Sequence, residues 1–212
     1  MFETYRVAHT TRFSLCGGAS KTRIPAKTQS SVDPSKLATA RERLRRRYRP
    51  ARVRLLFVGE SPPASGRFFY QADSGLYRAI RQTFLSAFPD LTNADFLKSF
   101  RKLDCYLVDL CGNPVDRLPT KQRRLAWTRG EAQLAAQIRQ LDPETIVTVV
   151  RSIAANVEHA QARAKWQGTH IELPYPGRWK THRDAFEQAL RPVLRRTLPD
   201  QVGADSINLR HR

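Results

Sequence analysis

Cysteine is scarce in this sequence of 212 residues. Cys16, Cys105 and Cys111 are the three present, and none of them has the C-x-x-C spacing. This small, odd set argues against a disulfide-stapled fold, a zinc ribbon and an iron–sulfur cluster with four cysteine ligands. Cys105 and Cys111 flank an apolar segment and are interpreted as core thiols. The sequence therefore predicts neither a metal site nor a cofactor.

Long apolar runs are also missing. No segment approaches the length of a transmembrane helix, and residues 1–18 lack the apolar centre of a signal peptide. The expectation is a cytoplasmic protein of bacterial type without a membrane partner. A transit peptide is the alternative interpretation of the Arg- and Ser-rich, acid-poor leader.

Acidic residues are few: 19 Asp and Glu stand against 37 Lys and Arg, for a formal net charge of +18. An excess of this size predicts attraction to a polyanion, and nucleic acid is a better candidate than a membrane surface. Hydrophobic residues make up 41% of the chain, which is enough to build the core of one domain.

Residues 1–52 differ in composition from the rest, with 13 Lys and Arg against three acids and few large apolar residues. We predict a basic arm that is largely disordered when free. Within it, Asp33 as N-cap and Pro34 at the first helical position predict a short basic helix ending near Tyr48. This helix is interpreted as a phosphate-contacting element, with a solvated arginine-rich face as the alternative.

Residues 53–198 alternate short apolar segments with amphipathic ones, which predicts a single α/β domain. The order of elements predicts a three-layer α/β/α sandwich around a central parallel sheet of about four strands. Residues 117–129 are predicted as a basic loop and residues 199–212 as a frayed tail. The predicted strands are 53–59, 104–110, 145–150 and 171–173, and the predicted helices are 74–88, 93–102, 131–141, 152–165 and 181–198.

Candidate functional residues follow the predicted strand ends. Glu60 comes after the first strand and before a double proline, Asp109 lies at the end of the second, and a loop over 174–179 follows the fourth. Because ligands bind outside the carboxyl ends of parallel strands, these residues are expected at one edge of the sheet. Glu60 is a candidate catalytic carboxylate, although a role as a helix cap or in an ion pair with an arginine explains its presence equally well.

Four ordered segments carry a family resemblance: VGESPP, LDCYLVDLCGNP, LAAQIRQLDPETIVTVVRSIA and HIELPYPGRWKTHRDAF. Together they resemble the uracil-DNA glycosylase superfamily over roughly residues 53–194, and VGESPP is most similar to its Gly-Glu-x-Pro branch. The cysteine count does not provide the iron–sulfur cluster of that branch. The resemblance implies a monofunctional, metal-free glycosylase that acts on DNA.

The resemblance also implies roles for individual residues. Glu60 would position or deprotonate the water that attacks the sugar carbon, in a loop formed with Gly59, Ser61 and Pro62. An aromatic residue would stack on the extruded base, and this is Tyr70 with Phe69 as the alternate. Core packing is the competing explanation for at least one aromatic of the cluster. The loop that would contact DNA comprises Pro174, Tyr175, Pro176, Gly177, Arg178, Trp179 and Lys180.

Two positions depart from the family pattern. Asp109 stands where most members have an asparagine, and its carboxylate would favour a base edge that presents amino or imino hydrogens. A helix cap or an ion pair is the alternative role for Asp109. Leu173 stands where a histidine is usual, and His170 or His182 would have to replace that imidazole, unless both are ordinary surface histidines.

Two hypotheses therefore remain for the function. In the first, the protein is a base-flipping DNA glycosylase that removes uracil or another altered base from single- or double-stranded DNA, and DNA keeps it at the nucleoid. In the second, it is a glycosylase-fold module that binds nucleic acid with little or no catalysis. An enzyme of free nucleosides is disfavoured, because small substrates do not require a charge of +18.

Overall fold

The computed structural model describes residues 34–91 and 95–198. The chain divides into a unit of residues 1–32 and a unit of residues 33–212, and every described residue belongs to the second. The predictions for the first 33 residues, including the Asp33 cap, and for the tail over 199–212 lie outside the described residues.

A sheet of four parallel strands forms the centre of the described unit, in the order β2-β1-β3-β4. The strand β1 is hydrogen-bonded on both sides and buried along its length, which is why it reads as an uninterrupted apolar run. The predicted parallel sheet is thus confirmed. The strands are β1 (Leu55–Gly59), β2 (Cys105–Asp109), β3 (Thr145–Thr148) and β4 (Thr169–Glu172).

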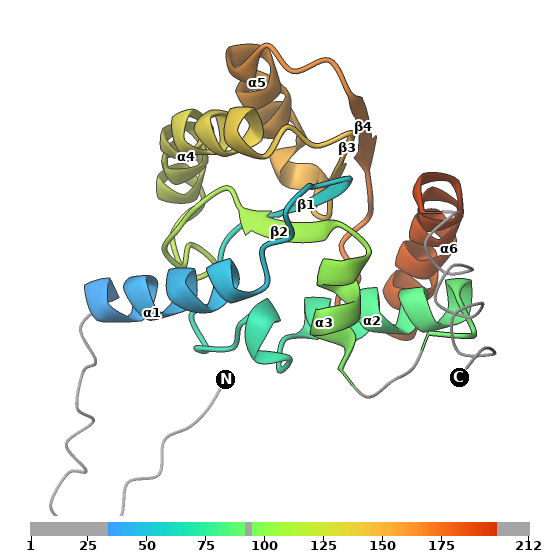
Figure 1. The fold of residues 1–212 in the computed structure, drawn as a ribbon. Coiled ribbons are helices and arrows are strands. Elements are labelled where there is room, and N and C mark those ends of the chain that lie inside the picture. Colours follow the sequence, from blue (N-terminus) through green and yellow to red (C-terminus); the bar gives the residue numbers. More distant parts are fainter. Residues whose placement is uncertain (1–33, 92–94, 199–212) are drawn as a thin grey trace, which may run out of the picture. The chain divides into compact units, whose positions relative to one another are not determined.

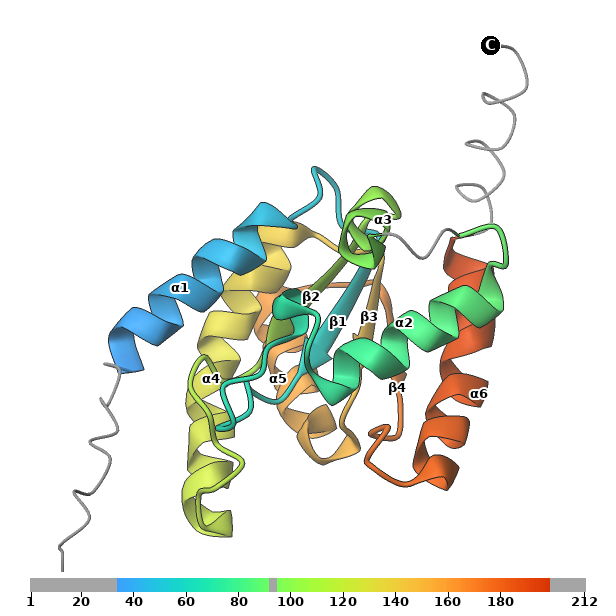
Figure 2. The same cartoon turned by 90° about the horizontal axis from the view of Figure 1, so that it is seen from below.

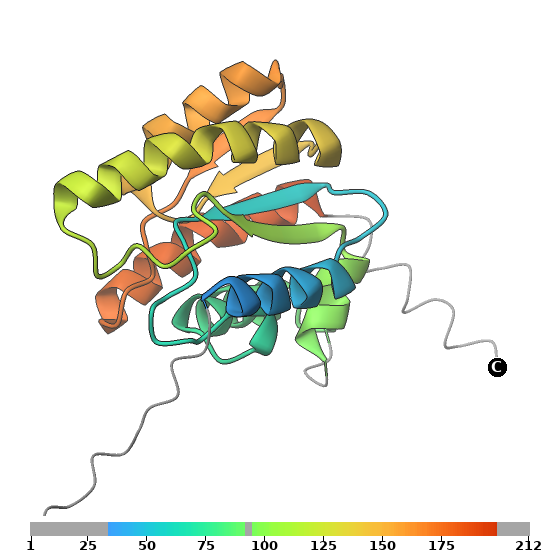
Figure 3. The ribbon, with the colours of Figure 1, turned by 90° about the vertical axis from the view of Figure 1, so that its left-hand side faces the viewer.

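Helices cover both faces of this sheet and complete the predicted three-layer α/β/α sandwich. Figures 1 and 3 show α4 and α5 on one face, α2, α3 and α6 on the other, and α1 on the α2 side near the β2 edge. None of the described helices is long and apolar enough to cross a membrane. The α-helices are α1 (Pro34–Arg47), α2 (Gly75–Ala87), α3 (Phe96–Lys102), α4 (Thr120–Leu141), α5 (Ala154–Ala164) and α6 (Lys180–Thr197).

Aromatic side chains pack the central strand β1 against the helices α2 and α3. Phe57 of β1 contacts Phe84 of α2 and Phe100 of α3, with ring centroids 6.5 and 5.6 Å apart. Ile80 and Phe84 lie one turn apart and are fully buried, so α2 presents an apolar stripe to the sheet. Ser74 caps this helix, since its hydroxyl accepts a hydrogen bond of 3.1 Å from the Tyr77 amide.

The first half of α4 corrects the sequence-based assignment. The helix begins at Thr120 and not at Glu131, so most of the predicted basic loop over 117–129 is helical. Pro119 precedes it with a φ of −54°, and Lys, Gln, Arg and Leu are all good helix formers. The sequence-based assignment treated this segment as a basic loop and did not take its helix propensity into account. As a result, α4 extends beyond the sheet toward the carboxyl ends of the strands (Figure 3).

The predicted basic helix is present as α1, and it packs on the domain. Arg45 is buried with 8% of its surface exposed, and its guanidinium lies over the Phe68 ring at 5.5 Å. Tyr48 stacks on Tyr70 with centroids 5.7 Å apart. The unit boundary therefore falls before this helix, whereas the sequence had placed residues 34–52 in the arm.

Candidate active site

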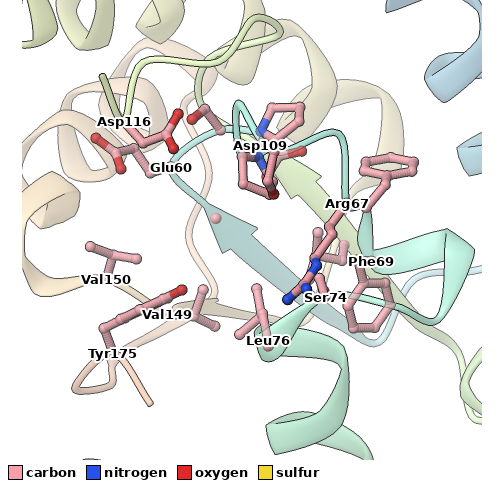
Figure 4. Close-up of a pocket in the computed structure, with 18 of the residues that line it drawn as sticks. Glu60, Arg67, Phe69, Ser74, Leu76, Asp109, Asp116, Val149, Val150 and Tyr175 are labelled. Carbon is pink, nitrogen blue, oxygen red and sulfur yellow. The ribbon is translucent and has the colours of Figure 1, made fainter. Parts of the chain in front are cut away.

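A pocket of about 440 Å³ opens at the carboxyl ends of β1, β2 and β3. Figure 4 shows Glu60 and Asp109 in its wall, together with Val149 and Tyr175, and Phe69 lies on the side away from Tyr175. These residues come from the carboxyl end of β2 and from the segments that follow β1, β3 and β4, which parallel topology brings to the same edge of the sheet. The expectation that Glu60, Asp109 and the loop before α6 share one edge is confirmed.

Glu60 is held by two side chains of α4. Its carboxylate accepts hydrogen bonds of 2.5 Å from Arg123 Nε and Nη2, and one of 2.7 Å from the indole Nε1 of Trp127. The Arg123 guanidinium also lies 5.6 Å from the centroid of the Trp127 ring. The ion pair with an arginine, which the sequence left open as an alternative, is thus observed beside the pocket.

The geometry of these bonds leaves one free acceptor on Glu60. A carboxylate has about four lone-pair positions, two on each oxygen. Arg123 and Trp127 occupy both positions on Oε1, whereas Oε2 accepts only from Arg123 among the described residues. Since Glu60 lines the pocket and its side chain is 11% exposed, Oε2 can accept one further hydrogen bond from a water molecule.

Asp109 lies in the pocket wall, in the strand next to β1. Its Oδ2 accepts a hydrogen bond of 2.9 Å from Arg45, and burial raises the pKa of this carboxyl while the Arg45 charge opposes the increase. A Cβ placed on Gly59 would lie 2.8 Å from Asp109 Oδ1, so a side chain at this position would force the Asp109 carboxylate to move. Asp109 therefore combines an ion pair with a position in the pocket wall.

The aromatic cluster over 68–70 separates into two residues that line the pocket and one that does not. Phe69 lines the pocket, and Phe68 lines it beside Arg67. Tyr70 does not line it: its hydroxyl donates to the Leu107 carbonyl and accepts from the Leu107 amide at 3.0 and 2.8 Å. Burial also raises the pKa of Tyr70 well above its ordinary value. By position, Phe69 and not Tyr70 is the aromatic that a base in the pocket would meet.

Ser61 and Pro62 also lie where the resemblance placed them. Both line the pocket next to Glu60, and the Ser61 hydroxyl accepts a hydrogen bond of 3.3 Å from the Val115 amide. That bond joins the loop after β1 to the loop after β2. Asp116 of the second loop lines the pocket as well, and its carboxylate accepts a hydrogen bond of 3.0 Å from the Ala64 amide.

The loop between β4 and α6 forms the rim of the pocket. Tyr175 lines the pocket while half of its surface stays exposed, and burial raises its pKa, with the Glu60 charge adding to the increase. Trp179 is 62% exposed, and the Arg178 guanidinium lies 5.4 Å from the centroid of its ring. An exposed aromatic ring beside a cation is suited to stacking on a base.

Other residues of the same loop shape it without reaching the pocket. Pro176 is buried, Pro174 is half-buried, and Lys180 forms an ion pair of 2.6 Å with Asp184 within α6. Gly177 has a φ of +50° and lies so close to the His182 ring that a side chain there would collide with it.

Neither candidate histidine reaches the pocket. His170 lies in β4, where its Nε2 is 2.8 Å from the Thr148 hydroxyl and burial lowers its pKa. His182 is exposed in the first turn of α6 and packs against Gly177. Leu173 is buried in the core with 1% of its surface exposed. Their positions do not support the expectation that either imidazole replaces the missing histidine.

One group of side chains in the described ranges could hold a metal ion. It comprises Glu158, His170 and Glu172, whose ligand atoms lie within 4.8 Å of one another. The group lies between α5 and β4 and shares no residue with the pocket wall. The pocket wall itself contains three carboxylates. Arginines bind two of them, Glu60 and Asp109, and the third, Asp116, accepts a hydrogen bond from the Ala64 amide.

The three side chains that bind Glu60 and Asp109 from α1 and α4 were not predicted from the sequence: Arg45, Arg123 and Trp127. Arg123 and Trp127 are spaced i, i+4, which places them on one face of a helix. That signal was available in the segment that had been assigned to a loop. Arg45 gave no such signal, because it is one of several arginines in a row.

Comparison with known protein families identifies this chain. The family model described as uracil DNA glycosylase superfamily matches residues 46–198, which include all four strands of the described sheet and every residue of the pocket wall. A search of curated proteins finds none that matches the chain.

Proposed function

Since the chain belongs to the uracil-DNA glycosylase superfamily, we propose that it is a DNA glycosylase that removes uracil or another deaminated or damaged base. In this proposal the target nucleotide leaves the helix, and its base enters the pocket at the carboxyl end of the sheet. The volume of about 440 Å³ falls within the usual range of small-molecule sites. The products are a free base and an abasic site.

The observation that carries the proposal is the position of Glu60. Its carboxylate lines the pocket and keeps a free acceptor on Oε2. A water molecule on Oε2 would bond through its oxygen to C1′ of the sugar as the C1′–N bond breaks and its electron pair leaves with the base. Glu60 would accept the proton that the water loses, and its negative charge would stabilise the oxocarbenium-like transition state.

Asp109 is the proposed reader of the base. Both of its oxygens are acceptors when the group is ionised, and Arg45 fixes one of them. The remaining oxygen would favour a base edge that presents an N–H group over one that presents only carbonyl oxygens. A base with an amino or imino hydrogen at this edge is therefore the preferred substrate of the proposed enzyme.

The charge of the chain supports a DNA substrate. The formal net charge is +18, and exposed Arg178 and Trp179 lie in the loop that forms the rim of the pocket. A cation with an adjacent aromatic ring can hold both the phosphate backbone and an unstacked base.

A second candidate is a glycosylase-fold protein that binds nucleic acid with little or no catalysis. The observation that favours it is the composition of the pocket wall, since none of the described residues lining the pocket is a histidine. The leaving base would then have no imidazole to stabilise its negative charge. The enzyme would break the bond between the base and the sugar of the bound nucleic acid, whereas the binding module would leave this bond intact.

A cleavage assay separates the two candidates. Purified protein is incubated with single- and double-stranded oligonucleotides that each carry one uracil, hypoxanthine, xanthine or oxidised base, and alkali then cuts every abasic site. Cleavage of one of these substrates supports the glycosylase and identifies its base. Tight binding to the whole set without cleavage supports the binding module.

A further inference from the structure

We infer that Arg123 and Trp127 are positioning residues, which hold the Glu60 carboxylate so that one lone pair of Oε2 faces the pocket. This inference rests on the proposed function, because it concerns the group that would direct the water. It goes beyond that function by giving a role to two residues of α4 whose side chains donate hydrogen bonds to the carboxylate.

The contacts define the orientation of the carboxylate completely. A single donor would leave the carboxyl group free to rotate about its terminal bond, which has a broad torsional preference. The bidentate Arg123 fork fixes the plane of the carboxylate, and the Trp127 indole selects Oε1 as the oxygen that carries two bonds. Oε2 is therefore the oxygen with a free position.

The positioning residues are themselves supported by their helix. Arg123 and Trp127 lie one turn apart in α4, and the guanidinium packs on the indole ring. A third of the Arg123 side chain is exposed, so the pair is neither fully solvated nor enclosed. An ion pair in this setting contributes modestly to stability, and its geometric effect on Glu60 is the larger consequence.

The positive charge of Arg123 is unfavourable for catalysis, and the geometry offsets this effect. A guanidinium next to the reaction centre repels the positive charge that develops on the sugar in the transition state. Water attack on an oxocarbenium-like carbon requires little basicity, because the carbon is already strongly electrophilic, but it does require the water in line with the breaking bond. Arg123 and Trp127 would supply that alignment.

The test compares four variants with the wild type: Arg123→Gln, Arg123→Lys, Trp127→Phe and the matched control Arg124→Gln. Arg124 is the exposed neighbour of Arg123 on the same helix and does not line the pocket. Cleavage under single-turnover conditions gives the chemical rate constant, and binding to an uncleaved oligonucleotide gives the affinity. Thermal unfolding shows that each variant folds.

We expect Arg123→Gln to lower the rate constant by about 10²-fold, the size of effect that a small misplacement produces. Arg123→Lys retains the charge without the fork and should recover only part of the rate. Trp127→Phe removes one hydrogen bond and should lower the rate by about tenfold at most. Affinity for DNA and the activity of Arg124→Gln should stay at wild-type values.

A further readout distinguishes positioning from a structural role. Guanidinium ions added to an Arg123→Ala variant should restore part of its rate, and an equal concentration of sodium chloride should not.

The failure of this inference can be told apart from the failure of the proposed function. A wild-type protein that cleaves no base removes the proposed function and this inference with it. Active wild type together with equally active Arg123→Gln overturns the inference alone, as does a loss of rate matched by an equal loss of DNA affinity. If Arg123→Gln does not fold, wild-type rates in both Arg123→Lys and Trp127→Phe overturn the inference.

Discussion

Arg45 of α1 and Asp109 of β2 form a buried ion pair of 2.9 Å across 64 positions of the chain. Their side chains are 10% and 7% exposed, and the guanidinium also packs on Phe68. This contact attaches α1, a helix of strongly basic composition, to a residue of the pocket wall. It also explains why one arginine in a basic run is buried while its neighbour Arg46 stays at the surface.

Replacing Arg45 should strongly destabilise the protein. In Arg45→Met the Asp109 carboxylate stays buried without its partner, and the expected loss in the free energy of unfolding is about 3–5 kcal/mol. Arg43→Met, on the exposed side of α1, should change it by about 0.5 kcal/mol or less. Urea unfolding measures both. Equal stability of the two variants would show that the pair contributes nothing.

Glu60→Gln should abolish cleavage and leave DNA affinity nearly unchanged. The amide keeps the shape of the side chain but cannot take the proton of the attacking water, and the expected fall in rate is about 10²–10⁴-fold. Single-turnover cleavage and fluorescence anisotropy with the same oligonucleotide give the two quantities. A parallel loss of affinity and rate would contradict the role assigned to Glu60.

Phe69 and Tyr70 should behave differently when each is altered. Phe69→Leu removes a ring from the pocket wall, and a loss of about 1–3 kcal/mol in base stacking should lower kcat/KM by about tenfold or more. Tyr70→Phe leaves the buried Leu107 amide and carbonyl without their partner and should cost about 1–3 kcal/mol of stability. Its folded fraction should cleave normally. Lost cleavage in a stable Tyr70→Phe would reverse the two assignments.

Trp179→Ala should weaken DNA binding more than it slows cleavage at saturating DNA. The exposed indole, four positions after the pocket residue Tyr175, would stack on an unpaired base, and its loss should cost about 1–3 kcal/mol in binding free energy. Trp179→Phe keeps an aromatic ring and serves as the control. Anisotropy titrations compare the three proteins, and an unchanged Kd in Trp179→Ala would exclude the indole from the interface.

The stability of the protein should depend on His170 in acid. Burial lowers the pKa of His170 in the folded state, although the charges of Glu158 and Glu172 oppose this shift. The unfolded state then binds the proton more readily, so the contribution of neutral His170 is present above about pH 6.5 and is lost as the pH falls through the lowered pKa. Unfolding free energies of wild type and His170→Gln, measured against pH, should converge in acid. A constant difference would contradict the prediction.

Much of the fold followed from the sequence because its strands are short apolar runs that end at glycine, proline or an acid. The run that ends at Gly59 could only be a buried strand, and the acid after it could only lie at a carboxyl-terminal edge. The prediction was wrong for the first half of α4. There, a basic segment was assigned to a loop, and it is a helix whose Arg123 side chain is bound to Glu60 in the folded protein.

The acids of the candidate site were predicted from the sequence, but the individual side chains that bind them were not. A carboxylate at a strand end is positioned by topology, which the order of elements defines. Whether Phe69 or Tyr70 faces the pocket depends on the rotation of a single short turn, and the position of His170 depends on the register of an edge strand. Local sequence patterns contain neither quantity.

The ion pair that attaches α1 to the domain affects which fragments of the protein can fold. The family match begins at residue 46, one position after Arg45. A fragment trimmed to that limit would have every strand and every pocket residue, yet it would carry an uncompensated negative charge in its interior. The smallest fragment that folds independently should therefore be longer than the shared family region, and its additional length should be found at the amino-terminal end.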